Sequence, residues 1–437
     1  MESVKVSVII PVYDPGDGIR KCIHSLRRQT LQEIEIIFVD DCGTDNSMDV
    51  IREAAYGDPR ICILKNPENM GSGPSRNRGI EAARGKYLSF VDADDFVSED
   101  FLELLYRKAE ASGADIVKGR RVLIWEDGTP VEETDTKLNE RICEGLKSGT
   151  PLLMLFRYEH QSAIYRRDWV FASGARYGSS LNAQDTTFLL EVTYGTDKIT
   201  FADEAKYFYV ARNDSRTKDF SERRLKSQML ALREKIDYLT NKEGYSTVLV
   251  SYVSIKLTYY LSIQASAVIR CESSDVADVF FSDIYELAEG LPYVDQIAEQ
   301  NLIMEAFIYH KVNLSLEPYD EKWGHVQFDE YLNAVHRVVD FLCNHPDLTA
   351  RYKYFLWQAF GNAIRYKETD SNTRKYKKEK RLKLRTDADR LPDSSVLTLP
   401  IRLYIYYGID TYTFQQTLIG KQLKILLARW RDKSMNT

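Results

Sequence analysis

The chain has 437 residues, of which 44% are hydrophobic and 28% are charged. This balance is typical of a globular protein with two or three domains, and it excludes disorder as a description of the whole chain. The net charge of −6 argues against a protein that binds nucleic acid through a basic surface. Six widely spaced cysteines without a CxxC pair predict reduced thiols and no structural zinc.

Membrane-spanning segments are not predicted. The apolar run at residues 6–13 is too short for a signal peptide or a membrane span, and apolar runs elsewhere stop short of 18 residues or contain a charge. We therefore expect a cytoplasmic protein that is at most peripheral at the inner face of the cell membrane.

Five short runs rich in β-branched residues predict strands in the first 118 residues. They are Val4–Val12, Ile34–Val39, Ile61–Leu64, Tyr87–Val91 and Asp115–Lys118. Apolar residues at helical spacing occur between them, for example in segments 19–26 and 101–108. This alternation predicts right-handed βαβ crossovers and hence an α/β fold with a doubly wound, mainly parallel sheet.

The pattern changes after residue 118. An Asp127-Gly128 hairpin signal lies between the strand candidates Val122–Trp125 and Val131–Thr134, and Ala205–Val210 is a further candidate. Beyond residue 219 the chain is mostly helical in character. We expect 1–118 and 119–218 to form two halves of one α/β domain, followed by a helical region at 219–373 and a basic amphipathic segment at 374–437.

The C-terminal segment differs in charge from the rest of the chain. Residues 374–437 contain 15 Lys/Arg and 6 Asp/Glu, a local charge of +9 that leaves −15 for the remainder. An apolar stripe runs from Phe414 to Trp430, with basic residues largely off it. Such a helix packs on its own protein or lies on an anionic membrane, and both alternatives remain open.

Polar residues follow three of the predicted strands. Segment 11–14 follows the first strand, Asp40-Asp41 the second, and Asp92-Ala93-Asp94 the fourth. In an open α/β sheet, ligands bind beyond the carboxyl ends of the strands. Carboxylates gathered there repel one another unless a cation lies among them, so the pattern predicts Mg²⁺ or Mn²⁺ shared with phosphates.

Glycine-rich phosphate loops do not explain this edge. The segment 79–87 resembles a P-loop but has five residues between its glycines and Tyr87 in place of Ser/Thr. The segment 71–76 resembles a dinucleotide fingerprint but has Arg76 where the third glycine belongs. A nucleotide diphosphate would therefore need a metal and a basic residue to neutralise its charge. Arg76, which follows the third strand, is the candidate.

Three segments together carry a specific resemblance. They are SVIIPVYD (7–14), SLRRQTLQEIEIIFVDDCGTDNS (25–47) and NMGSGPSRNRGIEAARGKYLSFVDADD (69–95). In this order and spacing they resemble the family 2 glycosyltransferases of the GT-A fold, with weaker similarity to about residue 217. The resemblance implies an inverting enzyme that moves a sugar from a nucleotide-sugar donor with the help of a metal at a DxD motif.

The resemblance also implies which residues bind the donor. Matching positions place one group around the base and ribose, one acid at the uracil edge and an Arg-Asn pair beside the nucleotide. The implied set is Pro11, Val12, Tyr13, Asp14, Asp40, Asp41, Asn69, Arg76, Asn77, Asp92 and Ala93. Asp94 is the implied direct metal ligand, and Asp92 meets the ribose, the metal or a metal-bound water.

A second family signature, an acid-Asp pair that opens a helix, matches Gln184-Asp185, with Gln184 in place of the usual Glu. A single displacement needs one base to take the proton of the acceptor hydroxyl, and the resemblance implies Asp185. Three simpler alternatives remain open: Asp185 as an N-cap, Asp41 as a cap for a turn with Gly43, and Tyr13 as a packing residue. Arg212, near a further family segment, is a weaker candidate for a phosphate contact.

The predicted function is transfer of a hexose or N-acetylhexosamine from a UDP-sugar to a hydroxyl of a growing surface glycan or lipid-linked oligosaccharide. Two alternatives stay open. A sugar-1-phosphate nucleotidyltransferase would need a glycine-rich basic loop that segment 11–18 lacks, and a catalytically degenerate scaffold is suggested by Gln184 alone. All six histidines are interpreted as structural, because none has metal-ligand spacing.

Overall fold

The structure is a computed structural model. It describes residues 3–131, 137–156, 160–180, 183–211, 222–242, 328–350 and 374–393, with isolated positions between 250 and 397. The chain divides into two compact units, Met1–Tyr252 and Val253–Thr437. The finer boundaries at 118, 218 and 373 stay a prediction.

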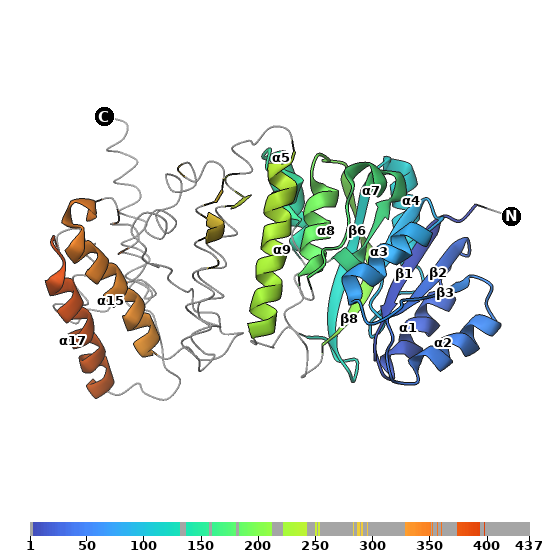
Figure 1. The fold of residues 1–437 in the computed structure, drawn as a ribbon, viewed down its shortest axis with the longest axis horizontal. Coiled ribbons are helices and arrows are strands. Elements are labelled where there is room, and N and C mark those ends of the chain that lie inside the picture. The colour runs from blue at the N-terminus through green and yellow to red at the C-terminus, as the bar shows by residue number, and fades with distance from the viewer. Residues whose placement is uncertain are drawn as a thin grey trace, which may run out of the picture. The chain divides into compact units, whose positions relative to one another are not determined.

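One mixed sheet organises the first unit (Figure 1). Its strand order is β3-β2-β1-β4-β7-β6-β8-β5. The strands are β1 (Val6–Val12), β2 (Ile34–Asp40), β3 (Ile61–Lys65), β4 (Tyr87–Phe90), β5 (Phe96–Val97), β6 (Ile116–Trp125), β7 (Ala163–Arg166) and β8 (Ile199–Ala211). Strands β3, β2, β1 and β4 are parallel, which confirms the predicted doubly wound half.

The second half of the sheet is mixed. β7 pairs antiparallel with both β4 and β6, and β5 pairs antiparallel with β8. β6 is a single strand where the sequence suggested two separate ones, and a register shift after Lys118 marks the place where they join. The Asp-Gly turn forms, because Trp125 N donates to Thr129 O at 2.8 Å; residues 132–134 of the second predicted arm lie outside the described residues.

Helices cover both faces of this sheet (Figure 1). They are α1 (Gly18–Arg27), α2 (Ser47–Tyr56), α3 (Ser72–Ala82), α4 (Phe101–Ser112), α5 (Leu138–Lys147), α6 (Leu152–Leu155), α7 (Arg167–Ser173), α8 (Gln184–Thr193) and α9 (Glu222–Thr240), with a 3₁₀ turn η1 at His160–Ser162. Because strand side chains alternate, Val8 and Ile10 pack with α1, α2 and α4, whereas Ile9 packs with α3, α7 and α8. Two separate cores result.

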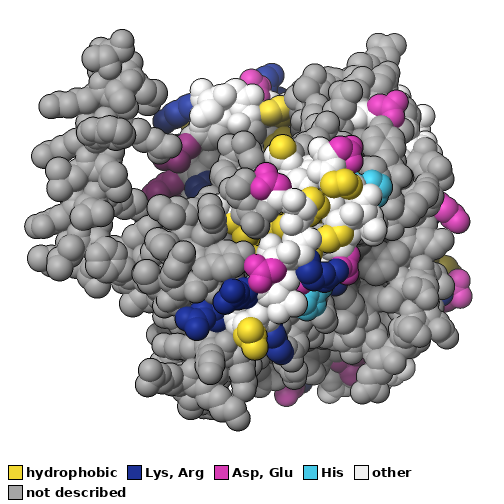
Figure 2. Space-filling model, turned by 90° about the vertical axis from the view of Figure 1, so that its left-hand side faces the viewer, with side chains coloured by type: hydrophobic (Ala, Val, Ile, Leu, Met, Phe, Trp, Pro, Cys, Tyr) yellow, Lys and Arg dark blue, Asp and Glu magenta, His cyan; other side chains and the backbone are white. Residues whose placement is uncertain are grey.

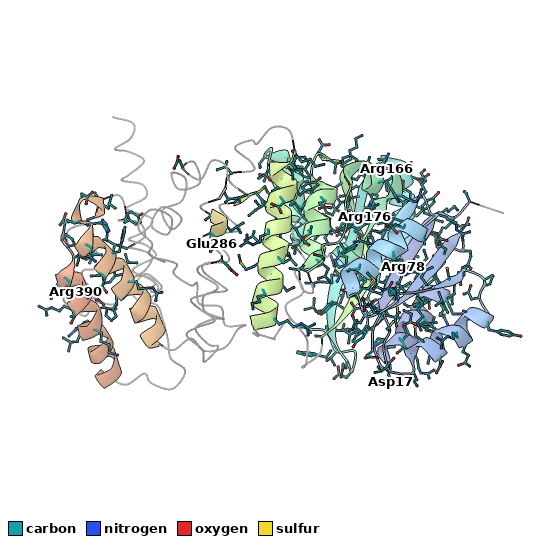
Figure 3. The ribbon with its side chains drawn as sticks, viewed as in Figure 1. Asp17, Arg78, Arg166, Arg176, Glu286 and Arg390 are labelled. Carbon is teal, nitrogen blue, oxygen red and sulfur yellow. The ribbon has the colours of Figure 1, made fainter. Side chains whose placement is uncertain are left out.

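In the second unit the structure describes α15 (Phe328–Asn344), η5 (Pro346–Leu348) and α17 (Arg374–Arg390). Arg390, labelled in Figure 3, pairs with Asp340, and His336 Nδ1 lies 2.6 Å from the buried Asp387. Figure 2 shows Lys and Arg side chains beside Asp and Glu side chains, so the charges visible on that face have both signs. Among the helices that can be described, none combines the length and apolar character needed to cross a bilayer.

Candidate active site

The carboxyl ends of β1, β2 and β4 meet at one edge of the sheet. Val12 and Asp40 are register partners, and Val91 N donates to Ile9 O where the chain leaves β4. The parallel pairing therefore brings the polar segments after these three strands together, as the sequence predicted. The candidate site is built on this edge.

Asp14 ties two loops of the edge together. Its Oδ1 accepts hydrogen bonds from Thr44 N at 2.5 Å and Asp45 N at 3.0 Å. A Cβ at Gly43 would lie 2.7 Å from the same oxygen, so this close approach requires glycine. Tyr13, just before it, is 40% exposed, which leaves much of its ring open to a ligand.

Asp41 fixes the loop that leads into α3. Its Oδ1 accepts from Asn66 Nδ2 at 2.7 Å and Met70 N at 2.9 Å, and its Oδ2 accepts from Gly71 N at 2.9 Å. Asn69 Oδ1 accepts from Gly71 N at 3.2 Å. These partners are not those of the turn cap with Gly43. An ionised carboxylate has about four acceptor sites, so Asp41 retains capacity for one more donor.

The neighbouring Asp40 is 5% exposed, and its Oδ1 accepts from Cys42 N at 3.0 Å. Pro11 is half-buried and Val12 is buried at the end of β1. The backbone of these residues therefore gives the edge its shape. Contacts of Pro11, Val12 and Asp40 with the nucleotide stay a prediction.

Arg76 of α3 forms a buried ion pair with the first acid of the DxD motif. Its Nη2 donates to Asp92 Oδ1 at 2.5 Å, and its guanidinium lies 5.1 Å from the ring centre of Tyr177. Burial acts to lower the pKa of Arg76, but the Asp92 carboxylate raises it overall. Arg76 is 4% exposed, and its Nε and Nη1 have no hydrogen-bond partner among the described residues. Two buried donors are therefore available to a ligand oxygen.

Asp92 is held from both sides. Its Oδ2 accepts from Gln161 Nε2 at 3.0 Å, and its backbone N lies 3.1 Å from the Tyr207 hydroxyl. Burial acts to raise the pKa of Asp92, but Arg76, His160 and Gln161 lower it overall. The carboxylate is therefore ionised at neutral pH and fixed in direction.

The two acids that follow differ in environment. Asp94 is half-buried, whereas Asp95 is 1% exposed and accepts from the Tyr207 hydroxyl at 2.7 Å and Val210 N at 2.9 Å. Burial, with Asp92 and Asp94 nearby, raises the pKa of Asp95 well above its ordinary value. Asp95 therefore supports the loop, which leaves Asp92 and Asp94 as the metal candidates.

Within the described ranges, no group of three or more His, Cys, Asp or Glu side chains is arranged to hold a metal ion. Mg²⁺ commonly keeps several waters and takes only one or two carboxylates together with substrate phosphates. Asp94, with the fixed Asp92 beside it, fits such a site. It does not fit a cage made of protein ligands alone.

Asn77 and Gln184 join the donor half to the second half of the domain. Asn77 Nδ2 donates to Tyr177 O and its Oδ1 accepts from Tyr177 N, both at 2.8 Å. Gln184 Nε2 donates to Ser72 Oγ at 2.7 Å, and its buried Oε1 has no partner among the described residues. The loop before α8 and the start of α8 are thus held against α3.

Asp185 lies in the first turn of α8. Ala183, with φ +66°, occupies the N-cap, and no side chain caps this helix, so the N-cap alternative for Asp185 is not what forms. Burial acts to raise the pKa of Asp185, but His160, Arg76 and Lys235 lower it overall. An ionised carboxylate without a capping role can accept a proton.

His160 belongs to the same cluster, although the sequence indicated only a packing role. Its ring is 5.4 Å from Tyr177 and 6.1 Å from Phe90 between ring centres, and its Nδ1 is 3.7 Å from Asp185 Oδ2. Burial lowers its pKa, although Asp185 acts in the opposite direction. The imidazole is therefore neutral at pH 7, and no local motif marks it in the sequence.

A substitution at Gly73 tests how tightly α3 and α8 pack against each other. A Cβ there would lie 2.5 Å from Gly178 O and 3.1 Å from Gln184 Cγ. We expect Gly73→Ala to lower the free energy of unfolding by about 1–3 kcal/mol, because the backbone of one element must move. Gly57→Ala is the matched control, since its nearest atom, Arg27 Nη2, is 3.6 Å away. Equal urea midpoints for the two variants would show that the junction is not tightly packed.

Comparison with known proteins shows what this chain is similar to. Residues 7–171 match the sequence pattern of the family "Glycosyl transferase family 2". The chain is 32% identical over 219 residues to the uncharacterized glycosyltransferase YibD of Escherichia coli (strain K12), covering 48% of this chain and 62% of that protein. It is 35% identical over 130 residues to the poly(ribitol-phosphate) beta-glucosyltransferase of Bacillus spizizenii, covering 29% of this chain and 20% of that protein.

The chain thus spans less than two thirds of the length of these curated relatives. Among solved structures, S. aureus TarS 1–349 in complex with UDP-GlcNAc superposes with a TM-score of 0.55 at 18% identity, covering 69% of this chain and 86% of that chain. At that identity the likeness concerns the fold, and it confirms the predicted GT-A fold. Arg212 lies outside the described residues.

Proposed function

We propose that the protein is an inverting glycosyltransferase that moves a hexose or N-acetylhexosamine from a UDP-sugar to a hydroxyl of a growing surface glycan or lipid-linked oligosaccharide. One observation carries the proposal: the adjacent residues His160 and Gln161 link Asp185 to the Arg76–Asp92 pair. His160 Nδ1 lies 3.7 Å from Asp185 Oδ2, and Gln161 Nε2 donates to Asp92 Oδ2 at 3.0 Å. A proton acceptor close to a fixed charged pair suits a single displacement.

In the proposed reaction, Asp185 takes the proton of the acceptor hydroxyl while the hydroxyl oxygen bonds to the anomeric carbon. The bond from that carbon to the diphosphate oxygen breaks, and UDP leaves with the electron pair. The free Nε and Nη1 of Arg76 donate to an oxygen of the donor, and the reciprocal bonds of Asn77 hold Tyr177 behind the guanidinium. Asp94 and Asp92 would hold Mn²⁺ or Mg²⁺, which would supply positive charge for the diphosphate when bound.

The test is UDP release from a panel of UDP-sugars with Mn²⁺ or Mg²⁺, with and without a hydroxyl acceptor. Slow donor hydrolysis that needs an intact Asp185 supports the proposal. UDP binding without any turnover across the panel would instead favour the nucleotide-binding scaffold. Formation of a nucleotide sugar from a sugar 1-phosphate would favour the nucleotidyltransferase.

The C-terminal segment supports a second, separate proposal of peripheral attachment to an anionic membrane at the inner face of the cell. In the described part of α17, Leu382 is 64% exposed and Lys383 and Arg385 are exposed beside it. The apolar stripe from Phe414 lies outside the described residues. Basic residues near an anionic surface contribute on the order of 1 kcal/mol each, an attraction that weakens with salt.

We expect the full chain to sediment with anionic vesicles at low salt and to be released at high salt. A variant in which Lys383 and Arg385 are replaced by Gln should sediment less, whereas replacement of the exposed Arg52 should have no effect because it lies in unit 1. Sedimentation that does not change with salt concentration would contradict the membrane proposal. The absence of sedimentation at low salt would contradict it as well.

A further inference from the structure

The strongest unexplained feature of the site is the buried imidazole of His160. The side chain is 1% exposed, and neither ring nitrogen has a hydrogen-bond partner among the described residues. An imidazole left in this state loses the hydrogen bonds it makes in water, so such a group calls for an explanation. Its ring faces Asp185 through Nδ1, at 3.7 Å from Oδ2.

The carboxylate of Asp185 likewise lacks a hydrogen-bond donor among the described residues. It makes no hydrogen bond to another described residue, and its ion-pair-range contact among them is with His160 Nδ1. Other groups that act on it electrostatically are Arg76 of α3 and Lys235 of α9, while Lys235 Nζ donates to Thr186 Oγ1 at 2.7 Å. His160 is therefore the side chain placed to orient this carboxylate.

The surroundings of His160 hold its ring in place. Phe90 and Tyr177 flank it, and its backbone O accepts from the Tyr165 hydroxyl at 2.9 Å. The separation of 3.7 Å is too long for a hydrogen bond and close enough that a small rotation of either side chain would make one. In apo structures, catalytic hydrogen bonds are often long and tighten when substrate binds.

We propose that His160 is a positioning residue for the base Asp185: its Nδ1–H donates to one carboxylate oxygen and holds the other toward the acceptor hydroxyl. This inference rests on the proposed function. The acceptor proton still goes to Asp185, and His160 keeps its own proton throughout. A base misplaced by about 1 Å can cost on the order of 10²-fold in rate, which sets the expected effect.

Two variants separate this role from packing. His160→Asn keeps a donor near the place of Nδ1 and loses the ring, whereas His160→Phe keeps the ring contacts with Phe90 and Tyr177 and loses the donor. We expect His160→Phe to lower kcat by about 10–10²-fold with unchanged KM for the donor, and His160→Asn to retain more activity despite a lower Tm. If His160 only fills space, the order reverses, and that result would overturn the proposal.

The double variant gives a second test. If His160 acts through Asp185, adding His160→Phe to Asp185→Asn should not lower kcat further, because the two residues act as one unit. Independent, multiplicative losses would contradict the positioning role.

A spectroscopic measurement separates this inference from the proposed function. In ¹⁵N-histidine NMR of the full chain, we expect the ring signal absent from His160→Phe to show a proton on Nδ1, and Asp185→Ala to move that proton to Nε2. An Nε2–H tautomer in the unaltered protein would overturn the inference even if the enzyme transfers sugar. An Nδ1–H tautomer without any sugar transfer would support the contact and refute the proposed function.

Discussion

Asp185→Asn is expected to lower the rate of sugar transfer by about 10²–10⁴-fold, the range in which general-base catalysis contributes. The substitution keeps the size of the side chain and its place in the first turn of α8, and removes the ability to take a proton. Donor affinity should hardly change, because the residues predicted to hold the nucleotide lie on the other half of the domain. The measurements are kcat with acceptor present and the Kd for UDP.

The matched control is Asp168→Asn. Asp168 lies in the first turn of α7 and is exposed, so this variant also removes one acid near a helix N-terminus without touching the site. Full activity in Asp185→Asn would show that another residue is the base. Burial acts to raise the pKa of Asp185, but His160 and Arg76 lower it overall. Its carboxylate form therefore persists into acidic solution, and kcat should not fall on this group's account until the pH reaches that lowered pKa.

Asp94→Asn is expected to abolish the metal-dependent part of the stabilisation that UDP gives to the fold. A ligand at about 100 times its Kd raises the free energy of unfolding by about 2.7 kcal/mol, which a thermal shift readily detects. An amide oxygen is a weaker ligand for Mn²⁺ than a carboxylate, so the difference between UDP alone and UDP with Mn²⁺ should vanish. The Tm without ligand should remain close to that of the unaltered protein.

Asp49→Asn is the control for this second expectation, because Asp49 is an exposed surface acid paired with Arg52. Its Mn²⁺-dependent shift should equal that of the unaltered chain. If Asp94→Asn keeps the same shift, the metal assignment at the DxD motif is wrong, and the proposed transfer would have to be tested without it.

The parallel half of the fold could be predicted from the sequence because each strand is a short buried run with a local signal. The bounds of β1, β2, β3 and β4 differ from the predicted ones by two residues or fewer. The antiparallel insertion of β7 between β4 and β6 could not be predicted. It depends on the register of Ser89 with Ile164, a pairing between distant residues with no local pattern.

In the candidate site, too, residues marked by a local motif could be predicted, and residues placed by distant strand pairing could not. Asp92, Asp94 and Asp185 could be predicted as candidates because motifs mark them, and the convergence of strand ends is a general property of α/β sheets. Gln161 and His160 lie in the site only because β7 is inserted between β4 and β6. No motif near them in the sequence therefore indicates that they belong to the site. Asp41 shows the converse: its position was predicted, but its hydrogen bonds to the loop at 66–71 arise from tertiary contacts.

We propose that this chain binds a nucleotide sugar at the edge formed by β1, β2 and β4 and transfers the sugar with Asp185 as base. The most direct measurement is UDP release from UDP-sugars by the purified full chain, compared between the unaltered protein and Asp185→Asn at saturating donor with Mn²⁺. We predict turnover in the unaltered protein and a loss of at least about 10²-fold in the variant, with equal UDP affinity. Equal turnover in the two proteins, or UDP affinity lost together with turnover, would contradict the claim.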